Sequence, residues 1–407
     1  MLIASKYKIR DVRAREILDS RGEPTIEVEI ITSGGVFSAS APSGASRGSL
    51  EAKELRDGGE RYFGKGVLKA VKKVLEVVKP KIKGLDATNQ EKIDQILIEI
   101  DGTEDKSNLG SNTLFAVSVA VCKAGSFNIP VFRYIAEKFS FSPKIPKVCF
   151  NIINGGVHAG NDLAFQEFMI CPQNEIFSEN LRDGVEIYQK LKEILKKKFG
   201  KTAINLGDEG GFAPPLSKIE DAIQIILECI FELKKENVKI ALDCASNQFF
   251  KNGKYFVDQR EYEGESLLNF YKYLVEKYQI FSLEDPFSEE DWENWQKITQ
   301  FGILIVGDDL LVSNKNRLKK AIDKKACNCC LIKINQIGTI TEAVETIKMA
   351  KNAGFKIFCS HRSGETVDDF LADFAVGVGA DFLKAGAPAR GERVAKYNRL
   401  LKIEEIL

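Results

Sequence analysis

The sequence lacks net charge, long apolar runs and a regular cysteine pattern, and it contains only two histidines in 407 residues. Lysine plus arginine and aspartate plus glutamate both number 58, so the overall charge gives no reason to expect nucleic acid or an acidic membrane surface as a partner. No apolar stretch approaches ~18 residues, and the apolar run at the start is too short for a signal peptide. We therefore expect a cytoplasmic protein.

The nine cysteines are scattered and odd in number. Cys327, Cys329 and Cys330 are too close together in sequence to surround a tetrahedral metal on their own. The pattern predicts small, reduced core residues rather than a disulfide framework or a zinc site.

The length favours two domains. Residues 25–32 alternate like a half-buried strand, and residues 35–44 follow after a Ser-Gly-Gly turn, which predicts a hairpin. The two prolines in 139–146 indicate a boundary. We predict an N-terminal α+β domain over 1–138, which carries a lid loop, and a barrel domain over 145–407.

Two amphipathic helices are predicted from apolar spacing. The first, within 66–82, should end near Pro80. The second should start at Ser217, because Ser217 and Glu220 have the spacing of a capping box.

The second part of the chain has a regular spacing of strand ends. Successive apolar runs stop at a polar residue, in the order Asp243, Glu284, Asp308, Lys333, His361 and Lys384, at intervals of 41, 24, 25, 28 and 23 residues. Steps of about 25 residues fit a strand plus a helix, the repeat of a (β/α)₈ barrel. A doubly wound sheet would alternate similarly, but no Gly-x-Gly-x-x-Gly turn follows an early strand.

In a barrel these six residues would meet at one mouth. Three are carboxylates, Asp243, Glu284 and Asp308, and such a concentration of negative charge requires a cation. Oxygen ligands favour Mg²⁺ over zinc. A single carboxylate at the end of a strand would more simply be interpreted as a side chain in contact with solvent.

Lys333 and Lys384 add cations to the same mouth. We expect Lys384 and a metal to depress the pKa of Lys333, so that its neutral form serves as a general base. A lone strand lysine would instead extend its ammonium to solvent.

Two loops complete the candidate site. Glu209, between glycines in 205–214, is a candidate general acid. Residues 42–48 form a small hydroxyl-bearing loop that suits either a lid or a plain surface turn.

The motifs that carry these residues occur in an order that resembles the enolase family over nearly the whole chain. They are AREILDSRGEPTIEVE, PSGASRG, ELRDGG, DGTEDKSNLG, NGGVHAGN, QEFMI, GDEGGFAP, LDCAS, LEDPF, GDDLLVSN, KINQIGT, SHRSGET, KAGAPARGER and AKYNRLLKIEE. The resemblance implies an α/β protein with an enolase-type (β/α)₈ barrel and an N-terminal α+β domain. It also implies a cytoplasmic glycolytic lyase that dehydrates 2-phosphoglycerate to phosphoenolpyruvate with two Mg²⁺ ions, as a homodimer or higher homo-oligomer.

The resemblance also assigns roles by position. Lys333 corresponds to the base, Glu209 to the acid and Glu167 to the acidic partner of Glu209. Enolase-superfamily sites use a lysine or histidine base with one or two Mg²⁺ ions. The other correspondences concern substrate and metal: Gln166, Glu167, His158, Lys333, Arg362, Ser363 and Lys384 contact substrate, His361 borders the phosphate, Asp243, Glu284 and Asp308 bind the first metal, and Ser46 joins the second.

Three positions depart from the family pattern: Arg47 replaces the usual threonine of the lid, Glu23 an asparagine and Ala385 a threonine. Arg47 could contact the substrate phosphate or extend into solvent. Two rival functions stay open, another carboxylate lyase or racemase of the superfamily and a silent enolase scaffold that binds a partner, with an additional surface role left open. The SHRSGET motif together with Glu167 and Glu209 favours a phosphorylated three-carbon acid.

Overall fold

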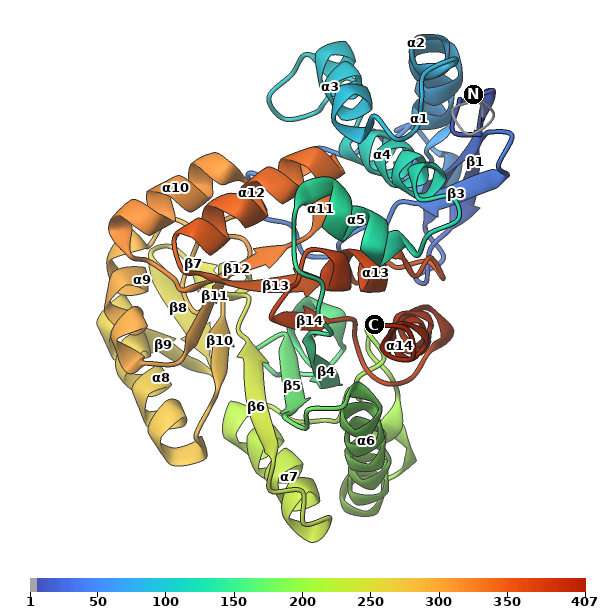
Figure 1. Cartoon of the computed structure of the whole chain (residues 1–407). Coiled ribbons are helices and arrows are strands. Elements are labelled where there is room, and N and C mark those ends of the chain that lie inside the picture. Colours follow the sequence, from blue (N-terminus) through green and yellow to red (C-terminus); the bar gives the residue numbers. More distant parts are fainter. Residues whose placement is uncertain (1–5) are drawn as a thin grey trace.

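The structure, a computed structural model, describes residues 6–407 and consists of a small α+β part followed by a closed barrel (Figure 1). The first part holds an antiparallel sheet in the order β1-β2-β3. Its strands are β1 Asp11–Leu18, β2 Pro24–Ile31 and β3 Val36–Ser40. The predicted hairpin is therefore confirmed, because β2 pairs with β3 across a short turn.

Five helices accompany this sheet: α1 Leu68–Lys73, α2 Lys79–Ile82, α3 Gln90–Asp101, α4 Ser111–Gly125 and α5 Val131–Phe139. Helix α4 is buried along almost its whole length, in agreement with its apolar composition. The predicted helix is confirmed, with an end at Ile82 that lies close to Pro80. A π-helical turn over Val74–Val78 joins α1 to α2, and Pro80, which lacks an N–H, lies in the first turn of α2 directly after this turn.

Eight strands close the barrel in the order β10-β11-β12-β13-β14-β4-β5-β6. Their bounds are β4 Lys147–Asn154, β5 Glu167–Pro172, β6 Val238–Asp243, β10 Ser282–Glu284, β11 Leu304–Gly307, β12 Cys329–Ile332, β13 Lys356–Ser360 and β14 Phe382–Lys384. The predicted barrel is confirmed. Strict alternation of strand and helix fails at its start, because no α-helix lies in the described segment between β4 and β5. Strand β5 accordingly runs antiparallel to both β4 and β6.

Helices surround the barrel and cover its outer face (Figure 1). They are α6 Phe177–Phe199, α7 Ile219–Glu232, α8 Gly264–Tyr278, α9 Trp292–Ile298, α10 Lys315–Lys324, α11 Ile334–Ile337, α12 Ile340–Asn352, α13 Phe370–Gly377 and α14 Gly391–Glu404. A small three-stranded sheet lies between β6 and α8, with strands β7 Phe250–Lys251, β8 Lys254–Val257 and β9 Arg260–Tyr262. No helix within residues 6–407 combines the length and apolarity needed to span a bilayer.

The predicted capping box at the start of α7 is wrong. Lys218 is the N-cap residue and makes no side-chain cap. The backbone N–H of Ile219 instead donates to the Asp258 carboxylate at 3.2 Å. A carboxylate 39 residues further along the chain thus satisfies the helix end that Ser217 was expected to satisfy.

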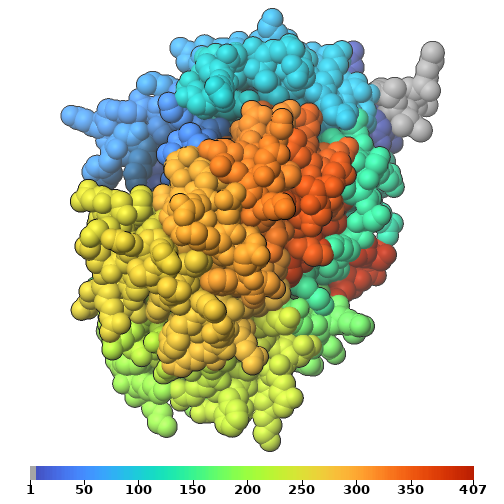
Figure 2. Space-filling model, turned by 90° about the vertical axis from the view of Figure 1, so that its left-hand side faces the viewer, coloured from blue at the N-terminus to red at the C-terminus, as the bar shows by residue number. Residues whose placement is uncertain are grey.

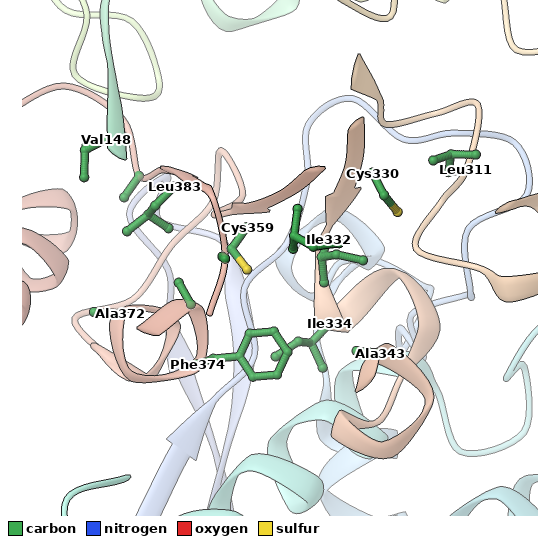
Figure 3. Packing of buried hydrophobic residues seen from close by; sticks show 14 of the residues in the cluster. Val148, Leu311, Cys330, Ile332, Ile334, Ala343, Cys359, Ala372, Phe374 and Leu383 are labelled. Atoms are coloured by element: carbon green, nitrogen blue, oxygen red, sulfur yellow. The ribbon is translucent and has the colours of Figure 1, made fainter. Parts of the chain in front are cut away.

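The barrel strands separate two apolar layers because alternate side chains point to opposite faces. Cys329 and Leu331 of β12 lie in the cluster that fills the barrel, whereas Cys330 and Ile332 pack outward against the helices. Figure 3 shows Ile332, Cys359 and Phe374 gathered between strands and helices. All nine cysteines are buried and free, which confirms the prediction of reduced core residues.

The N-terminal part covers the end of the barrel where the strand-end residues lie. The backbones of Ser43 and Gly364 exchange hydrogen bonds, which joins the 42–48 loop to the segment after β13. Figure 2 shows the early residues, in blue and cyan, lying over barrel residues in yellow and orange. The site therefore forms between the two parts of the chain.

Candidate active site

The ammonium of Lys384, at the end of β14, lies among three buried carboxylates. Its Nζ is 2.7 Å from Glu284 Oε1, 3.0 Å from Glu167 Oε1 and 3.3 Å from Asp243 Oδ2. Burial and then the neighbouring Asp243 raise the pKa of Glu284 well above its usual range. The pKa of Lys384 is also raised, since the surrounding carboxylates outweigh its burial. One fixed cation is thus shared by three carboxyl groups.

Lys333 and Asp308 form a second buried ion pair at the mouth. Gln336 Nε2 donates to the other oxygen of Asp308 at 2.9 Å. Burial opposes the charged form of Lys333, but the Asp308 carboxylate outweighs it and the pKa of Lys333 is raised. The expected depression of the pKa of Lys333 depends on a bound metal and stays a prediction; the ion pair with Asp308 by itself acts in the opposite direction.

Both histidines of the sequence face Glu209. His158 Nδ1 lies 3.5 Å from Glu209 Oε1, and His361 Nε2 lies 3.4 Å from Glu209 Oε2. Asn151 Nδ2 donates to Glu209 Oε2 at 2.9 Å. Burial lowers the pKa of His361 to about 4 and lowers that of His158 as well, so both rings are neutral near neutral pH.

Arg362 connects the barrel to the 42–48 loop. Its guanidinium binds both oxygens of Glu51, at 2.8 and 3.2 Å, and donates to the Ser46 carbonyl at 3.2 Å. The Ser363 hydroxyl accepts from the Ala45 N–H at 2.7 Å. A Cβ at Gly44 would lie 2.0 Å from the Arg362 guanidinium, so only glycine permits this approach.

These side chains surround one small cavity. Its walls include Ser46, His158, Gln166, Glu167, Glu209, Lys333, His361, Arg362, Ser363 and Lys384. The space measures about 10 Å³, roughly the room of one water molecule. A substrate can therefore enter only when part of the wall moves, and the 42–48 loop is the wall contributed by the N-terminal part.

Several oxygens in or next to this cavity, near the Lys384 ammonium, have the character of cation ligands. Buried Glu284 Oε2, Glu167 Oε2 and Gln166 Oε1 have no hydrogen-bond partner. Buried anionic oxygens without partners are costly, and a divalent cation would satisfy them. The donor set around Lys384 therefore fits Mg²⁺.

The predicted ligands do not all converge in this structure. Within residues 6–407, the potential ligand groups whose atoms lie within 4.8 Å of one another are His158, Glu167 and Glu209 in one case and Asp285, Asp308 and Asp309 in the other. Of the three predicted carboxylate ligands only Asp308 belongs to such a group. Asp243 and Glu284 instead share the Lys384 ammonium, which supplies positive charge between them.

Family models match both parts of the chain. One, described as the enolase N-terminal domain, matches residues 9–135, and the other, the enolase C-terminal TIM barrel domain, matches residues 142–407. The chain belongs to the enolase family. The enolase of Methanocaldococcus jannaschii is 49% identical over 408 residues, which cover 99% of this chain and 96% of that protein. The enolase of Thermococcus gammatolerans is 48% identical over 412 residues, covering 98% and 95% respectively.

Arg47, which departs from the enolase pattern, has a partly exposed guanidinium that binds neighbouring residues. Its guanidinium pairs with Glu54 at 3.1 Å and donates to the Ser43 hydroxyl at 3.1 Å. The side chain is 43% exposed, so it is partly in solvent as one of the two predicted orientations has it, and the ion pair with Glu54 is an addition that the sequence did not predict. The second departure, Glu23, forms ion pairs with Arg21 and Lys65 on the same surface.

The third departure, Ala385, is fully buried directly after the site lysine Lys384. Its methyl group belongs to the core cluster that packs between barrel and helices. The small apolar side chain therefore lies in the packing behind the site.

The sequence reasoning missed several residues that hold the enolase site together. Glu51 pairs with Arg362, Gln336 with Asp308, Asn151 with Glu209 and Arg393 with His361. Arg393 and Gln336 lie within the motifs KAGAPARGER and KINQIGT, and Glu51 lies shortly after PSGASRG, so their positions gave a signal. Each of these residues is far in sequence from the residue that it contacts, so the sequence gave no signal for the contacts themselves.

Proposed function

We propose that this enolase-family chain catalyses the reversible dehydration of 2-phosphoglycerate to phosphoenolpyruvate, with Lys333 as base, Glu209 as acid and two Mg²⁺ ions. The chain is thus a phosphopyruvate hydratase, a lyase. The observation that carries the assignment is that Lys333 and Glu209 line the same closed cavity, together with Arg362 and Lys384. A base, an acid and two fixed cations then surround one substrate.

Asp243, Glu284 and Asp308 are the residues that would hold the first Mg²⁺, and Ser46 on the loop would join the second. Bound Mg²⁺ supplies positive charge that stabilises negative charge developing on the substrate carboxylate. Lys384, already fixed among carboxylates, contributes a second positive charge to the same end of the cavity.

Lys333 removes the C2 proton, and it can do so only as a neutral amine. The ion pair with Asp308 holds the proton on Lys333. An Asp308 carboxylate shared with a divalent cation would attract the ammonium less, which lowers the pKa of Lys333 toward the working range.

Glu209 donates a proton to the departing C3 hydroxyl. Glu209 and Glu167 lie close enough that both cannot remain ionised without a large cost. Burial and then the Glu209 charge raise the pKa of Glu167 well above its usual range. The proton of the pair is therefore held on Glu167, from which it would pass through Glu209 to the leaving hydroxyl.

The phosphate would lie between the end of β13 and the 42–48 loop. Arg362 and Ser363 bind it, while Gln166, His158 and His361 line the remaining wall of the cavity. Arg362 is well placed for this role because a guanidinium binds phosphate oxygens in pairs. To do so it must exchange at least part of its contact with Glu51.

Ultraviolet absorbance of the enol product, followed after addition of 2-phosphoglycerate and Mg²⁺, tests the proposal. An increase that requires both additions is expected. Absence of product with properly folded protein would overturn it and favour a silent scaffold. Product from a different carboxylate substrate would identify another lyase or racemase of the superfamily.

A further inference from the structure

Arg393, in the first turn of α14, lies behind the proposed phosphate site and is fully buried. Its Nη1 is 2.6 Å from Nδ1 of His361 and donates to the Arg362 carbonyl at 2.6 Å. Its Nη2 donates to the Asp208 carbonyl at 3.0 Å and to the Ser363 carbonyl. One guanidinium therefore holds the acid's loop and the phosphate loop against each other.

The contact with His361 determines where the imidazole proton lies. A guanidinium has only donors, so Nδ1 of His361 must accept with its lone pair. In a neutral ring the proton is then on Nε2, the atom that faces Glu209 Oε2 at 3.4 Å. We propose that Arg393 is a positioning residue that fixes His361 as the neutral Nε2–H tautomer, so that His361 presents an N–H toward Glu209 and is not a proton carrier.

The charges around the ring agree with this assignment. Glu209 faces it from the 205–214 loop, Arg393 from α14 and Glu365 from the same segment after β13. Protonation of Nδ1 would place an N–H and a second positive charge directly against the Arg393 guanidinium. The ring can therefore change its protonation state only when Arg393 moves away.

The chain offers a matched control for the structural part of this role. Lys396, one turn further along α14, is also buried, and its Nζ donates to Glu365 Oε2 at 2.8 Å and to the Thr366 carbonyl at 2.7 Å. It anchors the same segment without a hydrogen bond to His361. Lys396→Met therefore removes an anchor and the countercharge of Glu365 but leaves the contact with Nδ1 of His361, whereas Arg393→Met removes an anchor and the tautomer constraint.

Nitrogen NMR of protein labelled with ¹⁵N-histidine tests the proposal directly, because the sequence has only two histidines. His158→Gln assigns the remaining ring. Wild-type protein should show His361 as the neutral Nε2–H tautomer throughout the range from about pH 6 to 8, the range in which an unconstrained histidine titrates. The Nδ1–H tautomer or a charged ring in wild-type protein would overturn the proposal, even if Arg393→Met fails to fold.

The variants separate positioning from packing. Arg393→Met should show a second tautomer or a ring that titrates at higher pH, because a positive charge has been removed, while Lys396→Met should retain the wild-type ring spectrum. Identical spectra for Arg393→Met and wild type would also overturn the proposal. The spectra need no turnover, so they remain decisive if the proposed function fails.

The catalytic consequence rests on the proposed function. Arg393→Met should lower kcat by roughly 10²-fold, change KM less, and add an ionisation to the pH profile that Lys396→Met lacks. Equal losses with unchanged pH profiles in both variants would show that Arg393 only anchors the loops.

Discussion

Lys384 of β14 and Glu284 of β10 form an ion pair of 2.7 Å across the barrel mouth, between strands that lie opposite each other in the ring of eight. The pair therefore ties together two walls that share no backbone hydrogen bonds. Asp243 and Glu167 approach the same ammonium from the intervening β6 and β5 side. The positive charge of Lys384 is a structural requirement of the mouth as well as a feature of the site.

Replacement of this lysine should make stability depend on Mg²⁺. Lys384→Met leaves three buried carboxylates without their shared cation, and breaking a buried pair costs about 3–5 kcal/mol. Thermal unfolding should show the loss without Mg²⁺ and a clear recovery with it, since the metal binds the folded state only. Lys351→Met, which removes a lysine that donates to the Val378 and Gly379 carbonyls, serves as the control and should show no recovery.

Asp308→Asn should abolish turnover and raise the Mg²⁺ concentration needed for any residual activity by orders of magnitude. The amide has lost the negative charge that pairs with Lys333 and would bind the metal. Circular dichroism should show an intact fold. Near-normal activity at low Mg²⁺ would remove Asp308 from the proposed ligands.

Acid and base should separate in an exchange experiment. Lys333→Ala should stop exchange of the substrate C2 proton with D₂O, because no other neutral amine is proposed at that carbon. Glu209→Gln should still allow exchange but block loss of the hydroxyl, which needs its proton. NMR of the C2 position decides, and exchange that survives in Lys333→Ala would contradict the assignment of the base.

Arg47→Thr should leave KM for 2-phosphoglycerate unchanged at both low and high ionic strength. Its guanidinium is bound to Glu54, and Glu54 keeps a second partner, Arg56, at 2.5 Å. The Arg47 side chain is 43% exposed, so the free energy of unfolding should fall by less than about 1 kcal/mol. A KM that rises at low salt and loses its salt dependence would show that Arg47 reaches the substrate.

Asp94 should make stability depend on pH. Burial raises its pKa to about 6, although Thr341, Ser118 and Gln90 donate to it. A raised pKa in the folded state means that the contribution is fully present below about pH 4 and is lost as the pH rises through about 6. The contribution of Asp94 to the free energy of unfolding should therefore fall by on the order of 2–3 kcal/mol across this range.

Asp94→Asn should remove most of that fall, because its amide cannot ionise. The buried Oε1 of Gln90, which has no partner, can accept from the new amide if the Gln90 side chain turns over. Glu91→Gln, at an exposed position of the same helix, should leave the pH dependence of wild type unchanged. Denaturant unfolding of the three proteins at pH 4, 5, 6 and 7, values chosen to span the titration, makes the comparison.

The sequence predicted the strand ends because a local pattern fixes them. An apolar run must stop where the strand leaves the core, and Asp243, Glu284 and Lys384 each terminate their strand as expected. The antiparallel β5 was not predicted, because a short apolar run carries no information about its direction.

Contacts between distant segments were not predictable in the same way. Asp258, 39 residues further along the chain, replaces Ser217 at the start of α7, because its position at that helix end is set by folding rather than by local spacing. The ion pair of Lys333 was not predicted for a related reason. The sequence suggested a metal and Lys384 as its neighbours, but the closest charge to its ammonium is Asp308.

The carboxylates that pair with Lys384 are all synthesised before it. Its partners Glu284, Asp243 and Glu167 precede it by 100, 141 and 217 residues along the chain. At about 5–20 residues per second, a ribosome completes the last of these carboxylates several seconds or more before it adds the lysine. During synthesis the three acidic side chains therefore remain without the Lys384 ammonium, and the barrel mouth can close only after β14 has emerged.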